Sequence, residues 1–372
     1  MQYVLVMKKV KSFYLTDYNN DTSKLVKATL RELFSKKNHG KTVYIHNSSS
    51  FNLIFLLKYI IKYPSTKVKP VVKDGKFINI EINFNKNYKL NLRDSILLLP
   101  GSLDKLSKQF NGISLKGIFP YSFVTPNNLN YIGSVPSYNY FDQSKVSEED
   151  YNNYCKDFKD NNWDLKAETI KYCSQDCRAL YQVIKEFGLL IFKLFNINIL
   201  TVPTLPSLAF KIYRTKFFPS KKEIKIPVIS DAMFNDLKKA YYGGHCDEHP
   251  LLPYKVNEST VYGVGTWEGW YYSEELKNAA KYGYTYEIKA GYLFEGQDIF
   301  SNYVKTLSKM KENSTKGTSM YLICKLLLNA LYGRYGMDFE VKTHLILDQK
   351  QISELIDNVG EWNIDKNNRY WR

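Results

Sequence analysis

Apolar and polar residues follow two different periods along the first half of the chain, which indicates strands mixed with helices. From Phe77 to Phe84 every second residue is apolar, and a similar run from Tyr88 to Asp94 follows after a polar turn. This alternation predicts a β-hairpin. Between Phe51 and Tyr63 the apolar residues recur at helical spacing, after a β-rich run from Lys41 to His46. We therefore expect a strand, a loop and a helix before the hairpin.

A long helical region closes the first half. Apolar residues recur at helical spacing from Leu165 to Phe195, with a break expected near Gly188, and Ser147 begins an earlier helix with acidic residues in its first turn. The stretch from Phe119 to Phe141 is rich in Pro, Asn and Gly, so we expect an irregular surface segment. Together these elements predict a mixed α/β domain that ends near residue 190.

The second half of the chain begins after a segment punctuated by prolines, Thr201 to Pro206, which we take as the domain boundary. Beyond it, Ser230 to Tyr241 is predicted to be helical and Tyr284 to Leu293 to be a strand. From Asp298 to Leu331 the pattern is helical, apart from residues Asn313 to Gly317.

Composition limits the class of protein. The chain of 372 residues has a formal net charge of +15, which favours a polyanionic partner, although A/T-biased codon usage would also enrich Lys, Asn, Ile and Tyr. Its five cysteines lack paired spacing, so neither a disulfide framework nor a structural zinc site is expected. We expect no membrane span, because no apolar run approaches roughly 20 residues. No secretory or transit pattern is found at the N-terminus, so an organellar protein of this kind would be made inside the organelle.

The stretch from Lys325 to Gly336, KLLLNALYGRYG, carries the strongest candidate chemistry. On a helix Lys325, Asn329 and Tyr332 lie on one stripe, and Gly333 follows. Such a face can hold a triphosphate with its lysine and present a tyrosine to the sugar and base, while the glycine permits close approach of the backbone. An ordinary amphipathic helix that ends at a glycine has the same pattern, so these residues alone leave both interpretations open.

The same stretch resembles motif B of family B DNA polymerases. Residues 119–141, 204–214 and 265–284 are similar to sequences of the protein-primed branch that linear mitochondrial plasmids encode. The resemblance implies that Lys325, Asn329, Tyr332 and Gly333 contact the incoming nucleotide. It also implies that Lys311 or Lys316 adds a second phosphate contact.

Two segments resemble motifs of a 3′–5′ exonuclease domain. Tyr172 and Asp176 have the spacing of its third motif, in which a phenol orients a water and a carboxylate holds a divalent metal. Its second motif, NxxxFD, begins at Asn47 and includes Phe51, but Asn52 replaces the metal-binding aspartate and supplies no anionic charge. The first motif, DxE, is expected to precede residue 1, so the resemblance implies that proofreading is lost.

Two further matches imply contacts with DNA, in addition to those of Asn47 and Phe51. Ser95 lies in a segment similar to the (S/T)Lx2h element, which contacts single-stranded DNA and the terminal protein. The YxGG element, which joins the exonuclease and polymerase parts and touches the template, is matched by Tyr241, Gly243 and Gly244. The resemblance therefore assigns these residues to DNA binding.

The matches leave a gap on the polymerase side. In the family a DxxSLYP strand, motif A, follows the YxGG element. Here residues His245 to Pro250 lead directly into a sequence that resembles the region beyond motif A. The DTD motif is expected downstream of motif B, and the chain reaches Arg372 without it. Nucleotidyl transfer uses carboxylates that hold two Mg²⁺ ions, so Mg²⁺ is implied while most of its ligands are missing. A replacement metal site within residues 245–249 is disfavoured, because adjacent ligands rarely converge on one ion.

The resemblance predicts an RNase H-like exonuclease-type domain in residues 1–200, a connection in 201–240 and a partial palm and fingers polymerase domain in 241–372. The implied reaction extends a DNA 3′ end from dNTPs, primed by a terminal protein, in mitochondrial DNA replication. We expect a catalytically incomplete polymerase. The alternatives are a non-catalytic nucleic-acid-binding remnant, a subunit that needs a partner chain, and a decayed reading frame without a selected function.

Overall fold

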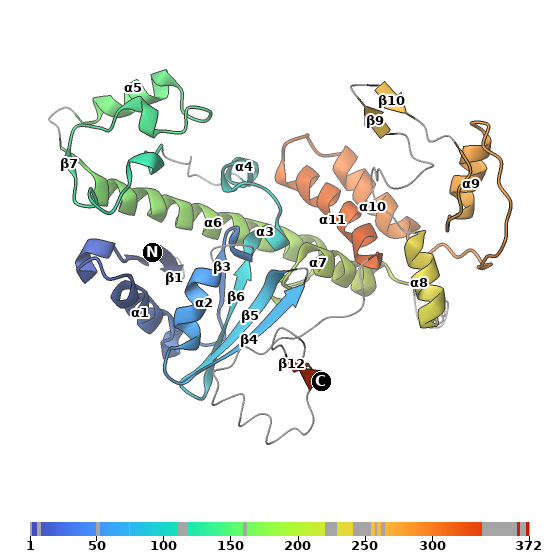
Figure 1. Ribbon diagram of the computed structural model, residues 1–372, viewed down its shortest axis with the longest axis horizontal. Helices are drawn as coiled ribbons and strands as arrows, with labels where there is room; N and C mark the ends of the chain where they lie inside the picture. Colours follow the sequence, from blue (N-terminus) through green and yellow to red (C-terminus); the bar gives the residue numbers. More distant parts are fainter. Residues whose placement is uncertain are drawn as a thin grey trace. The chain divides into compact units, whose positions relative to one another are not determined.

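The protein forms a mixed α/β structure, as the sequence predicted. In the computed structural model the described residues are 2–5, 9–49, 53–73, 75–110, 118–158, 162–219, 229–240, 254–256, 259–261, 265–336, 363–364 and 370–371. The chain divides into two compact units (Figure 1). Unit 1 comprises residues 1–205, 317–319 and 340–372, and unit 2 comprises residues 206–316 and 320–339.

Unit 1 is organised around a four-stranded sheet in the order β3-β6-β5-β4. Its strands are β3 (Thr42–Ile45), β4 (Thr66–Lys73), β5 (Lys76–Phe84) and β6 (Tyr88–Asp94). The predicted hairpin is confirmed as the antiparallel pair β5 and β6. β3 runs parallel to β6, with Ile45 opposite Asp94, so the two strands end at the same edge of the sheet.

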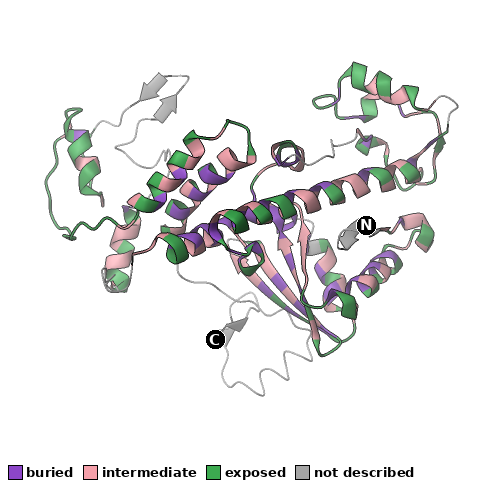
Figure 2. Ribbon diagram, turned by 180° about the vertical axis from the view of Figure 1, so that it is seen from behind, coloured by how far each residue is buried: buried purple, intermediate pink, exposed green. Residues whose placement is uncertain are grey.

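The core of unit 1 lies between this sheet and two helices, α1 (Thr22–Leu33) and α2 (Leu53–Ile61). Alternate residues of β5 and β6 point into it, which produces the alternating burial that Figure 2 shows along the strands. Ile80, Ile82 and Leu90 are fully buried, and the ring of Phe84 stacks on that of Phe34 at 5.3 Å. Each such aliphatic side chain contributes about 1.5–3 kcal/mol on burial.

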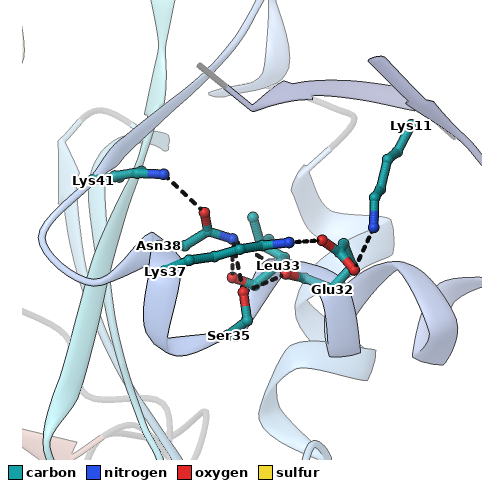
Figure 3. A network of polar contacts seen from close by, with 7 residues as sticks. All are labelled: Lys11, Glu32, Leu33, Ser35, Lys37, Asn38 and Lys41. Atoms are coloured by element: carbon teal, nitrogen blue, oxygen red, sulfur yellow. Dashed lines mark hydrogen bonds and ion pairs between the residues drawn. The ribbon is translucent and has the colours of Figure 1, made fainter. Parts of the chain in front are cut away.

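A polar network closes the C-terminal end of α1 (Figure 3). Buried Asn38 donates from Nδ2 to the carbonyl oxygens of Leu33 at 2.9 Å and Glu32 at 3.2 Å, which satisfies helix carbonyls that lack a partner within the helix. The Glu32 carboxylate pairs with Lys11 at 2.7 Å and also with Lys37. Hydrogen bonds from these two lysines lower the pKa of Glu32 below its ordinary value. The network thus links α1 to the strand that carries Lys11.

The longest element is α6 (Leu165–Phe195), against which α4 (Leu103–Gln109) and β1 (Gln2–Leu5) pack. Asp164 caps its start by accepting hydrogen bonds from the backbone nitrogens of Lys166 and Ala167. The break predicted near Gly188 is wrong, since the helix continues through it. A Cβ at Gly188 would lie 3.1 Å from Cδ1 of Ile199, so the glycine lets a neighbouring segment approach the helix rather than ending it.

Short elements complete unit 1. They are β2 (Lys9–Ser12), η1 (Leu15–Tyr18), η2 (Lys36–Asn38), α3 (Ser95–Leu98), η4 (Tyr121–Phe123), β7 (Ile132–Gly133), η5 (Tyr138–Tyr140), α5 (Glu148–Lys156), β8 (Trp163–Asp164), η6 (Ile199–Thr201), β11 (Asn363–Ile364) and β12 (Tyr370–Trp371). The segment 119–141 is irregular, as predicted, but it is not only surface. Its Phe119 joins a buried cluster with Trp163 and Leu165.

Unit 2 is built mainly from helices. They are α7 (Leu205–Ile212), the π-helical turn η7 (Tyr213–Phe217), α8 (Asp231–Lys239), α9 (Ser273–Ala280), α10 (Ser301–Glu312) and α11 (Ser319–Tyr335), with a small hairpin of β9 (Tyr254–Val256) and β10 (Ser259–Val261). Tyr303 of α10 is buried and donates to the carbonyl of Leu327 in α11 at 2.9 Å, which joins the last two helices. In the described part of the chain no helix is long and apolar enough to cross a membrane.

The strand predicted from Tyr284 to Leu293 is wrong. These residues belong to no strand, and within the described residues no other strand pairs with them. Apolar side chains stay exposed as a result, with Ile288 at 72% and Leu293 at 99% exposure. The alternation is present, but a strand also requires a neighbour that takes up its backbone hydrogen bonds.

Candidate functional site

The predicted polar stripe forms one exposed face of α11. Lys325, Asn329, Tyr332 and Gly333 are all exposed, and the side chain of Tyr332 is 54% accessible. The face exists because the opposite side of the helix packs into the core of unit 2. The residues buried on that side are Ile323, Cys324, Leu327 and Leu331.

Gly333 lies within α11 without a packing reason. A Cβ placed there would meet no atom within 4 Å, so neither the fold nor a neighbouring side chain requires a glycine. A glycine inside a helix costs about 1 kcal/mol relative to alanine. The open space beside it is therefore available to a bound molecule that approaches the backbone.

A second cation lies beside the same face. Nζ of Lys311, near the end of α10, is 5.6 Å from the ring centre of Tyr321, which precedes Lys325 by one helical turn. Burial raises the pKa of the Cys324 thiol, and the positive charge of Lys311 partly offsets this rise. Lys311 thus lies on α10 and Lys325 on α11, and Lys316 is exposed in the turn between these two helices.

Cations also gather where α11 ends, which the sequence analysis did not single out. The guanidinium groups of Arg214 and Arg334 each lie 5.6 Å from the ring centre of Phe210, and Lys238 donates to the carbonyl of Gly336. Positive charges are favourable at a helix C-terminus, and arginine binds well over an aromatic face. The signal in the sequence was an arginine in the last turn of an amphipathic helix.

In unit 1 the candidate DNA-binding residues Asn47 and Ser95 follow the parallel strands β3 and β6. Because these strands end at the same edge, the two segments meet. Nδ1 of His46 lies 2.9 Å from Oγ of Ser95, and the Asp94 carboxylate accepts from the backbone nitrogen of Ser49 at 2.7 Å. Neither His46 nor Asp94, the two groups that hold these segments together, was predicted from the sequence as a site residue.

The two residues at this edge differ in accessibility. Asn47 is exposed, with a backbone φ of 54°, whereas Ser95 is only 2% exposed and begins α3. Asp94 caps that helix by accepting from the backbone nitrogen of Ile96 at 3.0 Å. Asn47 can therefore meet a ligand directly, while the Ser95 side chain supports the edge from inside.

Tyr172 and Asp176 lie one turn apart on α6. Tyr172 is 6% exposed, its ring packs against Phe119 at 5.2 Å, and its hydroxyl accepts a hydrogen bond from the hydroxyl of Tyr121. Burial, then this hydrogen bond, then the charge of Asp176 raise the pKa of Tyr172 above its ordinary value. Asp176 is half-buried. Within the described residues no three His, Cys, Asp or Glu side chains come together as a metal site.

Several candidate residues lie outside the described residues. They are Phe51 and Asn52 of the second exonuclease motif, Tyr241, Gly243 and Gly244 of the YxGG element, and residues 245–249 after it. Their roles stay predictions.

Comparison with known proteins assigns the chain to a family of DNA polymerases. The family described as DNA polymerase type B, organellar and viral, matches residues 33–251 and 247–368, and the chain belongs to this family. Among individual relatives it is similar to a probable DNA polymerase of Neurospora intermedia, with 33% identity over 430 residues, and to one of Ascobolus immersus, with 34% identity over 427 residues. Both comparisons cover 94% of this chain, but only 44% and 35% of the respective relatives, so the chain spans less than half of their length.

The fold is similar to that of Phi29 DNA polymerase. The complex of that enzyme with primer-template DNA and incoming nucleotide substrates gives a TM-score of 0.51 at 16% identity, covering 82% of this chain and 61% of that chain. Its binary complex with primer-template DNA gives a TM-score of 0.50, with coverages of 83% and 63%. At this level of identity the likeness concerns the fold.

Proposed function

We propose that this chain is the nucleotide- and DNA-binding part of a protein-primed, family B DNA-directed DNA polymerase that acts in DNA replication. The observation that carries the proposal is the exposed face of α11, where Lys325, Asn329 and Tyr332 stand together above a buried apolar side. Membership of the family supports it. The fold likeness to a polymerase bound to primer-template DNA and nucleotides is consistent with it.

Each residue of the face has a defined part in holding a dNTP. The ammonium groups of Lys325 and Lys311 attract the triphosphate, because positive charges placed where negative charge gathers stabilise it. Tyr332 offers an exposed ring to the sugar and base, and Asn329 offers an amide that can both donate and accept. Gly333 leaves room for the ligand to approach the helix backbone.

The domain layout extends the same proposal. Unit 1 corresponds to the RNase H-like, exonuclease-type domain, in which Asn47 and the edge near Ser95 meet single-stranded DNA and the terminal protein. Tyr172 and Asp176 are the remnant of its hydrolytic site. Unit 2 corresponds to part of the palm and fingers. The organellar and viral family, together with the resemblance to plasmid-encoded enzymes, supports a mitochondrial location.

The proposal concerns binding, because the described residues bring together no carboxylates that could hold the Mg²⁺ ions of the family's reaction. Mg²⁺-dependent nucleotidyl transfer needs converging carboxylates, and the described residues provide no such cluster. The alignments support an internal deletion as the cause. They run over 430 and 427 positions, whereas 94% of 372 residues is about 350, so about 80 positions have no residue of this chain. The second candidate function, which is compatible with this gap, is a subunit that needs carboxylates from a partner chain.

Binding and extension can be measured separately on the full chain. We expect a fluorescent dATP analogue to bind without added protein partners, and Lys325→Ala to weaken that binding by about tenfold, which equals the loss of about 1.4 kcal/mol. Lys105→Ala, in α4 of unit 1, is the control and should bind normally. Equal affinity of the Lys325→Ala and control variants would reject the proposed face. Primer extension by the chain alone with Mg²⁺ would reject the limitation to binding.

A further inference from the structure

Unit 1 contains a second basic feature, which no motif of the sequence pointed to. An open hollow of about 770 Å³ lies where the chain bends from α2 into β4 and where β5 turns into β6. Four lysines line it, together with Tyr63 and Asn83: Lys62, Lys67, Lys69 and Lys86. Among the described residues that line it, none carries a carboxylate.

The backbone fixes where two of these lysines point. Along β4 the residues Thr66, Val68 and Pro70 are buried, whereas Lys67 and Lys69 between them are exposed. Residues two apart on a strand share one face and stand roughly 6.6 Å apart. The two lysines therefore form a row along β4, and the spacing of their backbone positions suits successive phosphates of one extended nucleic-acid strand.

The remaining lysines come from other elements. Thr66 donates through Oγ1 to the carbonyls of Ile60 at 2.9 Å and Tyr63 at 2.7 Å, and these bonds hold the bend that brings Lys62 beside β4. Lys86 lies in the turn between β5 and β6, next to the start of β4, because Thr66 is opposite Phe84 in the sheet.

Lys86 occupies a costly backbone position. The turn between Phe84 and Tyr88 has three residues, and the first two are left-handed, Asn85 with a φ of 47° and Lys86 with a φ of 62°. A Cβ is disfavoured at positive φ, and glycine adopts this conformation without that cost, whereas Lys does so rarely. A lysine is present where a glycine would be more stable, and this indicates a use for its charge.

The lysines of the hollow make no close contact with a carboxylate in the described part of the structure. Among the described residues, none of its four lysines forms an ion pair. The acid nearest in the sheet is Glu81, which lies opposite Lys69, but its carboxylate accepts from Nδ2 of Asn83 at 3.2 Å and lies 3.9 Å from Nζ of Lys89. The lysines thus present a positive surface to solvent.

A structural explanation covers only part of this arrangement. β4 is an edge strand of the sheet, and lysines on an edge discourage pairing with other chains. That role accounts for Lys67 and Lys69. It does not account for Lys62 or Lys86, which lie off the edge strand, nor for the strained backbone of Lys86.

We propose that this hollow binds the sugar-phosphate backbone of a single nucleic-acid strand. The row on β4 contacts successive phosphates, Lys62 and Lys86 close the two sides, and the Asn83 amide and Tyr63 hydroxyl supply hydrogen-bonding groups. The site lies at the opposite end of β6 from Asp94, roughly 20 Å from the edge with Asn47. It is separate from the proposed nucleotide face of α11.

The test uses the full chain and fluorescein-labelled oligothymidylate, with affinity measured by fluorescence anisotropy at several salt concentrations. The double variant Lys67→Gln/Lys69→Gln should bind about tenfold more weakly, and its dependence of log K on log salt should flatten by about 1.4, since each lost phosphate contact on a single strand removes about 0.7. Lys27→Gln/Lys36→Gln, which removes two exposed lysines elsewhere in unit 1, should change affinity less than twofold. Equal loss in both double variants would overturn the proposal, because it would show only an effect of net charge.

Lys86→Gly separates binding from folding. It removes the charge and relieves the left-handed strain, so DNA affinity should fall several-fold while the melting temperature holds or rises. Unchanged affinity would overturn the role of the turn.

Polyglutamate that binds as tightly as DNA, with the same response to the variants, would overturn the nucleic-acid assignment in favour of an acidic protein. Full competition by millimolar inorganic phosphate would overturn it in favour of a free anion. Binding of the dATP analogue should be normal in every hollow variant, so failure here is distinguishable from failure of the α11 proposal.

Discussion

The exposed stripe of α11 depends on single residues that take no part in packing. Lys325 and Asn329 are free of the core because Cys324 and Leu327, on the other side of the helix, fill it. Gly333 differs from Lys325 and Asn329, since it has no side chain to contact a ligand. Its proposed contribution is the space beside the backbone, which makes it the residue that best separates function from stability.

Gly333→Ala should weaken binding of the dATP analogue by about tenfold and leave the fold intact. The added methyl group meets no atom of the protein, and alanine in place of glycine within a helix stabilises by up to about 1 kcal/mol. Titration of the analogue and a thermal melt measure the two effects. Gly291→Ala, also in open space but outside any helix, is the control. Normal nucleotide affinity in Gly333→Ala would contradict the proposed close approach.

At the scale of elements, residues 284–299 show that an alternating pattern does not form a strand where no neighbouring strand pairs with it. The alternation from Tyr284 to Leu293 is that of a strand, yet these residues join no sheet in the described chain and leave Ile288 and Leu293 in solvent. Single side chains hold it instead. Tyr292 stacks on Trp270 at 5.7 Å and donates to the Asp236 carboxylate at 3.0 Å. Exposed apolar segments of this kind promote association between chains.

The double variant Ile288→Ser/Leu293→Ser should aggregate less than the original chain. Its free energy of unfolding should change by no more than about 0.5 kcal/mol. Both side chains are exposed, so their removal costs no core packing. Light scattering at rising protein concentration and a urea titration measure these effects. Leu189→Ser, which removes an exposed leucine from α6, should not reduce aggregation. A clear loss of stability would show that the segment packs against a partner.

At the scale of the whole molecule, each unit has its own core. Leu90 is fully buried in the sheet core of unit 1, and Leu307 is fully buried among the helices of unit 2. Units with separate cores unfold as separate cooperative transitions unless a large apolar interface joins them. The family relationship extends over both units, because the matched residues run from 33 to 368.

Thermal unfolding should therefore occur in two transitions, and core variants should assign them. Leu90→Ala should lower the midpoint temperature of one transition and Leu307→Ala that of the other. Each variant removes a fully buried leucine side chain, which reduces the free energy of unfolding of its unit by about 2–5 kcal/mol. Differential scanning calorimetry of the full chain measures this. If both variants shift a single transition equally, the two units unfold as one.

The sequence by itself determined the class of structure, the hairpin of β5 and β6, and the stripe on α11. Each depends on local periodicity, which a chain carries in the order of its residues. The sequence also predicted the family, because a motif such as KLLLNALYGRYG consists of contiguous residues.

Only the tertiary structure decided how distant segments meet. The parallel pairing of β3 and β6 brings His46 to Ser95, the bend after α2 brings Lys62 beside Lys86, and Ile199 accounts for Gly188 in an unbroken helix. It also left residues 284–299 outside any sheet. Pairing, convergence and close packing arise between residues far apart in sequence, so no local pattern contains them.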